Sequence, residues 1–167
     1  MKLLYLILGG NIGDREAILR QTIQCLVEDI GEIQQISSLY ETEPWGMKDA
    51  DYFLNQVVVL KTELLAFDIL DRILKIEARL GRVRSSYVAG YQSRPIDIDI
   101  LFLDSEIIQT SQLTIPHPEI QNRNFVLVPL CEINKDFMHP LLHETVGELL
   151  EKCNDPLKTT LFKLNMY

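Results

Sequence analysis

Two aspartates alternate with isoleucines in the segment Ile96-Asp97-Ile98-Asp99-Ile100. Because successive side chains of a β-strand point to opposite faces, this alternation predicts a strand with both carboxylates on one face and the isoleucines on the other. Carboxylates two residues apart lie roughly 6 to 7 Å from each other, near enough to share one hard cation or to bracket two. Magnesium prefers oxygen ligands and completes its shell with waters and phosphate oxygens, so two protein carboxylates suffice. The segment therefore predicts a magnesium site, and the competing interpretation is a half-exposed strand with a polar outer face.

A cluster of arginines precedes this segment. No acidic residue lies between Glu77 and Asp97, whereas half of the chain's eight arginines do. They are Arg79, Arg82, Arg84 and Arg94. Arginine presents a planar fork of donors that matches phosphate oxygens. Beside a carboxylate pair, the cluster predicts a site for a metal-bound polyphosphate, and the alternative is an arginine-rich loop that only balances surface acids.

A neutral group of residues lies earlier in the chain and comprises Thr42, Pro44, Trp45, Phe53 and Asn55. Flat aromatic rings can enclose a planar ligand, and an asparagine amide offers both a donor and an acceptor to its edge. Each aromatic residue taken alone is more typical of a core. Together the group favours a slot for a flat polar ring.

Three further stretches are weaker signals. The glycine-rich Gly9-Gly10-Asn11-Ile12-Gly13-Asp14 lacks the Lys-Ser/Thr ending of a phosphate-binding loop and the spacing of a dinucleotide fingerprint, so we interpret it as a turn. Pro116-His117-Pro118 and Asn122-Arg123-Asn124-Phe125 add two phosphate donors and another ring.

The elements that must position these groups follow from hydrophobic periodicity and from capping and turn residues. Strands are expected at 2–8, 33–42, 53–62 and 96–103, and helices at 14–30, with Asp14 as its N-cap, and 65–80, ended by Gly81. Short elements are expected at 106–109 and 159–163 as strands and at 122–133 and 145–152 as helices. The order βαββαβ favours an α+β fold of ferredoxin-like type, a mostly antiparallel sheet with helices on one face and the C-terminal third as additions.

The whole chain fits one domain, residues 1–167, because it is long enough for a single core and too short for two. A net charge of −8 and a pI near 4.9 argue against nucleic acid or an anionic membrane as a partner. The apolar start runs directly into glycines and resembles a strand more than a signal peptide, so we expect a cytoplasmic protein. The three scattered cysteines and three histidines lack metal-ligand spacing, and His139 and His143 are expected to face solvent.

Taken in order, the motifs resemble those of the 6-hydroxymethyl-7,8-dihydropterin pyrophosphokinases, which move pyrophosphate from ATP to a pterin in folate synthesis. The similarity covers nearly the whole chain, and the order and spacing of its parts carry it. Its parts are the glycine-rich stretch 9–14, Ser-Leu-Tyr-Glu-Thr-Glu-Pro at 38–44, Phe-Leu-Asn at 53–55, Glu77 with Gly-Arg-Val-Arg at 81–84, Arg-Pro-Ile-Asp-Ile-Asp-Ile-Leu at 94–101, Pro-His-Pro at 116–118 and Asn-Arg-Asn-Phe-Val-Leu-Val-Pro-Leu at 122–130.

This resemblance implies a monomeric, magnesium-dependent enzyme that binds ATP and a pterin. Asp97 and Asp99 would hold two Mg²⁺ ions and, with Arg82 and Arg94, form the catalytic set. The ATP-binding residues implied are Arg82, Arg84, Arg94, Ile98, Thr114, His117 and Arg123. The pterin-binding residues implied are Thr42, Pro44, Trp45, Phe53, Asn55, Tyr91 and Phe125, with Phe53 and Phe125 stacked on the two ring faces.

The chain departs from the family pattern at three places. Tyr91-Gln92-Ser93-Arg94 replaces the common Trp-Gly-Pro-Arg, Glu43 stands where a second proline is common, and Trp45 stands where a smaller apolar residue is common. Two other functions stay open from the residues themselves: a two-metal nucleotidyltransferase or nuclease, and a non-catalytic ligand-sensing module.

Overall fold

The computed structural model describes residues 1–44, 51–83 and 93–162 of the 167-residue chain. The expectations for Trp45, Arg84 and Tyr91 therefore lie outside the described residues.

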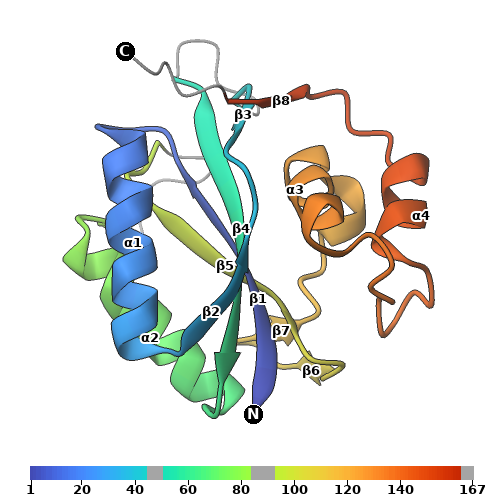
Figure 1. Ribbon diagram of the computed structural model, residues 1–167, viewed down its shortest axis with the longest axis horizontal. Coiled ribbons are helices and arrows are strands. Elements are labelled where there is room, and N and C mark those ends of the chain that lie inside the picture. The colour runs from blue at the N-terminus through green and yellow to red at the C-terminus, as the bar shows by residue number, and fades with distance from the viewer. Residues whose placement is uncertain (45–50, 84–92, 163–167) are drawn as a thin grey trace.

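An antiparallel sheet forms the centre of the molecule (Figure 1). Its strand order is β5-β1-β4-β3-β8, and β2 also pairs with β4. The strands are β1 (Lys2–Gly10), β2 (Glu32–Ile36), β3 (Tyr40–Thr42), β4 (Phe53–Thr62), β5 (Asp97–Leu103) and β8 (Thr159–Leu161), and a separate ribbon joins β6 (Ile108–Gln109) to β7 (Thr114–Ile115). β1 and β4 are the long central strands, and nearly all of their residues are buried, which explains their almost continuous apolar sequences. The predicted antiparallel sheet is confirmed.

Helices cover both faces of this sheet (Figure 1). One face packs on α1 (Arg15–Asp29) and α2 (Ala66–Arg79), and the other on α3 (Asn124–Asn134) and α4 (Val146–Lys152). A short 3₁₀ turn (Ile120–Asn122) precedes α3. The first pair comes from the βαββαβ segment and the second pair from the C-terminal third. The alternation in β5 divides its residues accordingly, with Ile98 and Ile100 buried toward α1 and α2 and the aspartates on the α3 face.

Helix ends follow the capping residues of the sequence. The carboxylate of Asp14 accepts a hydrogen bond from the Ala17 N–H at 3.0 Å, so Asp14 caps α1 as predicted. Thr145 and Glu148 form a reciprocal capping box at the start of α4. Gly81 follows the C-cap residue of α2, and its φ of +92° is the left-handed conformation that favours glycine.

The expectation for the C-terminal histidines was half wrong. His143 is exposed, but His139 is only 3% exposed. Its Nδ1 accepts hydrogen bonds from the N–H groups of Leu141 and Leu142, and its ring packs edge-on against Phe102 at 5.4 Å between centroids. His139 therefore serves as a buried acceptor that closes the loop before α4.

Candidate active site

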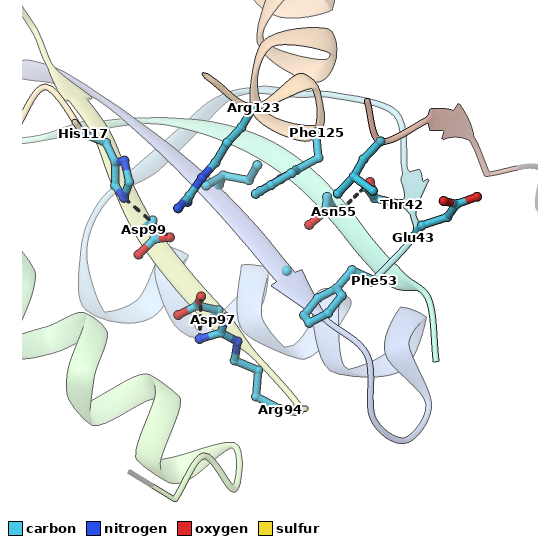
Figure 2. A pocket seen from close by; sticks show the side chains of 13 residues that line it. Thr42, Glu43, Phe53, Asn55, Arg94, Asp97, Asp99, His117, Arg123 and Phe125 are labelled. Carbon is cyan, nitrogen blue, oxygen red and sulfur yellow. Dashed lines mark hydrogen bonds and ion pairs between the residues drawn. The ribbon is translucent and has the colours of Figure 1, made fainter. Parts of the chain in front are cut away.

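A pocket of about 260 Å³ opens on the α3 face of the sheet (Figure 2). Strands β1, β4 and β5 form its floor, and its walls come from the end of β3, the segment after β7, the start of α3 and the chain before β8. The lining residues are Ile7, Gly9, Thr42, Glu43, Phe53, Asn55, Arg94, Asp97, Asp99, His117, Arg123, Phe125 and Leu157. The structure therefore brings together both predicted groups, the carboxylate pair and the ring slot.

Strand register explains how these distant residues meet. Gly9 of β1 pairs with Asn55 of β4 on one side and with Asp97 of β5 on the other, and the next inward pair is Ile7 with Asp99. Directly paired residues of an antiparallel sheet point to the same face. The amide and the first carboxylate thus flank a residue without a side chain, and a Cβ on Gly9 would come within 2.8 Å of the Asn55 Oδ1 atom. Gly9 keeps the floor between the two groups open.

Asp97 is held by two arginines. Arg82 Nη1 donates to its Oδ1, and Arg94 Nη1 lies 3.1 Å from its Oδ2. Both arginine side chains are largely covered, at 12% and 21% exposure. Arg82 and Arg94 of the arginine cluster therefore contact the first carboxylate of the pair.

Asp99 is the second carboxylate, and its environment differs. Burial and then the charge of Asp97 raise its pKa to about 7, against the lowering effect of Arg123 and Arg94. Its side chain is nevertheless 40% exposed, because it opens into the pocket while protein surrounds it elsewhere. A group with this pKa changes charge near neutral pH and gains from a nearby cation.

His117 faces Asp99, with its Nε2 3.9 Å from the Asp99 Oδ2 (Figure 2). Its Nδ1 accepts the Glu119 N–H at 3.1 Å, so the neutral ring carries its proton on Nε2, the atom directed at the carboxylate. Burial and then the charge of Arg123 lower the pKa of His117. His117 is therefore a neutral donor at the rim of the carboxylate pair.

The buried polar groups at the other end of the pocket are neutral. Asn55 Nδ2 donates to Thr42 Oγ1 at 3.0 Å, and both residues are 3% exposed. Because the hydroxyl fixes the amide, the Asn55 carbonyl oxygen lies over Gly9. Figure 2 shows the rings of Phe53 and Phe125 on either side of Asn55. This end can accept a flat ring and bond its edge.

The glycine-rich turn after β1 positions Arg94. The Asn11 N–H donates to the Arg94 carbonyl oxygen at 3.0 Å, and the Asn11 Oδ1 accepts the Arg94 N–H at 2.9 Å. A Cβ on Gly10 would lie 2.1 Å from the Pro95 carbonyl oxygen, so only glycine permits this approach. From the sequence alone we interpreted residues 9–14 only as a turn.

A second, more open cavity of about 710 Å³ adjoins the pocket and shares Asp99 and His117 with it. Ile98 and Thr114, both predicted to bind nucleotide, line it together with side chains of α2. Pro44 is described but is not among the residues that line either of these two cavities.

Several lining residues had not been predicted. Glu43 and Leu157 border the neutral end, and Gly9 forms the floor. Glu43 directly follows Thr42, so its neighbourhood was a usable signal, whereas Leu157 lies over one hundred residues further along the chain and carries none.

A carboxylate pair beside arginines and a slot for a flat ring is the arrangement of a phosphate-transferring enzyme that uses a metal. The family model described as 7,8-dihydro-6-hydroxymethylpterin-pyrophosphokinase (HPPK) matches residues 5–135. A 2-amino-4-hydroxy-6-hydroxymethyldihydropteridine pyrophosphokinase of Porphyromonas gingivalis is 42% identical over 142 residues, which cover 84% of this chain and 95% of the relative. The Bacillus subtilis protein of the same name is 44% identical over 130 residues, 77% of this chain and 76% of the relative. The chain belongs to the 7,8-dihydro-6-hydroxymethylpterin-pyrophosphokinase family.

Solved structures agree in fold. The crystal structure of Plasmodium falciparum HPPK-DHPS wild type with pteroate matches with a TM-score of 0.72 over 90% of this chain, at 21% identity. The chain spans 42% of the length of that protein. At 21% identity this similarity shows a shared fold and nothing more.

Proposed function

We propose that the protein transfers the pyrophosphoryl group of ATP to the hydroxymethyl group of 6-hydroxymethyl-7,8-dihydropterin, with release of AMP, in folate biosynthesis. As a family member the chain is a pyrophosphokinase, an ATP-dependent transferase. The observation that carries the proposal is the row Asn55–Gly9–Asp97 across three strands. If Asn55 bonds the edge of the pterin ring, the hydroxymethyl group of the pterin would lie over Gly9. It would then be next to Asp97, on the side of the pocket proposed for the phosphates.

Asp97 and Asp99 would hold magnesium, two ions with ATP. The donor set fits, because both carboxylates border one pocket and magnesium takes its remaining ligands from water and phosphate. When bound, magnesium would neutralise charge on the phosphate oxygens and orient them. Among the described residues no group of three or more His, Cys, Asp and Glu converges, so phosphate oxygens would be needed to complete the shell.

The phosphates would lie against the cationic side of the pocket. Arg94 and Arg123 line it, His117 presents a neutral N–H, and Arg82 reaches it through Asp97. The nucleoside would extend into the adjoining cavity past Ile98 and Thr114. Arg84, in the chain outside the described residues, is a further proposed phosphate contact.

The pterin would occupy the neutral end. Phe53 and Phe125 would stack on its faces, and Asn55, oriented by Thr42, would bond its edge. Pro44, Trp45 and Tyr91 are proposed as additional rim residues.

In the reaction, the hydroxymethyl oxygen would attack the β-phosphorus in line. The new O–P bond forms as the bond from the β-phosphorus to the bridging oxygen breaks, and AMP leaves with that electron pair while the hydroxyl proton passes to solvent. Arginines at the pocket would stabilise the charge on the transferring group. Positioning and electrostatics supply most of the catalysis in such transfers, so a dedicated base is not required.

Product analysis with ATP, magnesium and the pterin tests the proposal. AMP should form only when the pterin is present. Pyrophosphate released without the pterin would favour a nucleotidyltransferase, and intact ATP at high protein concentration would favour a ligand sensor.

We also propose a strand order, an oligomeric state and a location for the protein. A ferredoxin-like order of the core is supported by the antiparallel pairing of β1 with both β4 and β5. We also propose that the protein is a cytoplasmic monomer, as the family resemblance implies. The net charge of −8 supports the proposal that it binds neither nucleic acid nor an anionic membrane. Within the described residues, the helices are too short or too polar to cross a membrane.

A further inference from the structure

Glu77 is a buried carboxylate close to the active site but outside both cavities. It lies in the last turn of α2, on the face that carries Ile69, Ile73 and Ile76 against the sheet. Its side chain is only 1% exposed. A buried carboxylate is costly to the fold unless charged or hydrogen-bonded partners surround it. The identity of those partners therefore indicates what the residue does.

One oxygen of Glu77 binds two groups at once. Its Oε1 accepts the Ile98 N–H at 2.8 Å and lies 2.5 Å from Arg82 Nη1. Ile98 stands between the two aspartates in β5, and β5 is an edge strand of the sheet. Glu77 thus ties the backbone of the carboxylate-bearing strand to α2.

The same residue also fixes the backbone of Arg82. The Arg82 N–H donates to the Glu77 carbonyl oxygen at 3.0 Å, and the Gly81 N–H donates to the Ala78 carbonyl oxygen at 3.2 Å. These are the paired bonds of a Schellman ending, made possible by the positive φ of Gly81. Both ends of Arg82, its backbone and its guanidinium, are therefore attached to Glu77.

Arg82 Nη1 bridges two carboxylates, Glu77 behind it and Asp97 in front. The pKa of Arg82 is raised because the attraction of Asp97 and Glu77 outweighs its burial. Without the rear carboxylate, the guanidinium would keep only the carboxylate that the metal requires. Glu77 supplies a permanent partner, so Arg82 stays in place when Asp97 turns to a cation.

We infer that Glu77 is a positioning residue of the transfer reaction, which holds Arg82 and the β5 backbone so that the arginine and the carboxylate pair keep a fixed separation. This inference rests on the proposed function. It predicts that Glu77 acts on the chemical step through Arg82 and leaves the pterin slot, built from β3, β4 and α3, unaffected.

The test is a double-mutant cycle between E77Q and R82A, with AMP formation as the readout. Glutamine keeps the shape and one acceptor oxygen but removes the charge that anchors the guanidinium. E77Q should lower kcat about 10- to 100-fold, with the KM for the pterin changed less than about twofold. In the R82A background the same substitution should lower kcat no further, because its target is already absent.

Two further variants serve as controls for this experiment. D68N removes an exposed carboxylate at the other end of α2 and should keep wild-type kcat. E77D keeps the charge but withdraws it by one methylene, so it should lower kcat as well and replaces E77Q in the cycle if that variant does not fold. Thermal unfolding of each variant shows whether it is folded.

An activity-independent measurement completes the test. The Arg82 side-chain N–H signals, assigned by comparison with R82K, should exchange with solvent faster in folded E77Q than in the wild type. Unchanged kcat in folded E77Q, or an equal loss of kcat in the R82A background, would overturn the inference and leave Glu77 a purely structural role. An inactive wild type with faster exchange in E77Q would instead count against the proposed reaction and support the positioning.

Discussion

At the β5 end of the pocket Asp97 and its two arginines are charged and paired with one another, whereas at the β3–β4 end the buried polar groups are neutral and bonded to each other. Asp97 engages two arginines, and Asp99 has a pKa of about 7. Asn55 and Thr42, by contrast, are buried and bonded to each other in a way that leaves the amide oxygen available. The charged end must exchange partners when a ligand binds, but the neutral end needs no rearrangement.

The strongest test of this comparison is D97A, for which we expect kcat to fall about 10³-fold or more, since both the proposed metal ligand and the partner of two arginines are lost. AMP formation measures the loss. Binding of the pterin alone, followed by its fluorescence, should change by less than a few-fold if the two ends are independent. Full activity in both D97A and D99A would show that the metal assignment is wrong.

The reciprocal change is N55A. It should lower kcat/KM for the pterin about 100-fold, because the buried amide that we propose bonds the edge of the pterin is removed. Affinity for a magnesium–nucleotide analogue, measured by calorimetry, should stay the same. T42V provides a graded control, because it removes only the hydroxyl that orients Asn55 and should cost less. Weaker nucleotide binding in N55A would mean that the ends are coupled.

Magnesium binding at the charged end should depend on pH, whereas pterin binding at the neutral end should not. Magnesium requires an ionised carboxylate, and Asp99 is protonated below about pH 7. The apparent affinity for magnesium should therefore fall about tenfold per pH unit as the pH drops below this value, and level off above it. Pterin binding to the metal-free protein should be flat over the same range. The magnesium concentration needed for half-maximal rate, measured across pH, checks this, and a flat profile would contradict it.

A smaller effect concerns stability without ligands. Asp99 has a higher pKa in the fold than its usual 3.8, so the folded protein binds this proton more tightly than the unfolded chain does. Stability must therefore decrease as the pH rises from about 4 to 7 and stay reduced above that range. D99N lacks this penalty, and its Tm should exceed that of the wild type at alkaline pH, by about 2–4 °C for each kcal/mol of penalty, and match it near pH 4. Equal Tm values at alkaline pH would count against the raised pKa.

The sequence predicted the charged end well because local rules govern it. Alternation in β5 requires that Asp97 and Asp99 share a face, and the capping residue Asp14 and the terminator Gly81 placed the helices that flank the sheet. These features depend on neighbours within a few residues. They can therefore be predicted from a single sequence.

Other features depend on contacts between distant segments. Leu157 reaches the pocket because Asp155 accepts the Asn124 N–H at 2.9 Å and the Leu157 N–H at 3.0 Å. The sequence around position 157 does not predict that this segment contacts the start of α3. His139 was misplaced for the same reason, because its burial results from packing on Phe102 in β5. Glu77 belongs to the motifs of the resemblance, but its contact with β5 could not be predicted from the helix sequence, because its partner Ile98 lies 21 residues further along the chain.

The register of β1 also has a consequence for how the protein acquires its activity during synthesis. Gly9 must pair with Asn55 and with Asp97, so the floor closes only after a span of nearly ninety residues has been brought together. The walls add residues as late as Phe125 and Leu157. A nascent or partly folded chain therefore has no complete binding site, and pairings of such high sequence separation form slowly. Ligands can accordingly stabilise only the finished fold, which makes their binding a direct report on the last steps of folding.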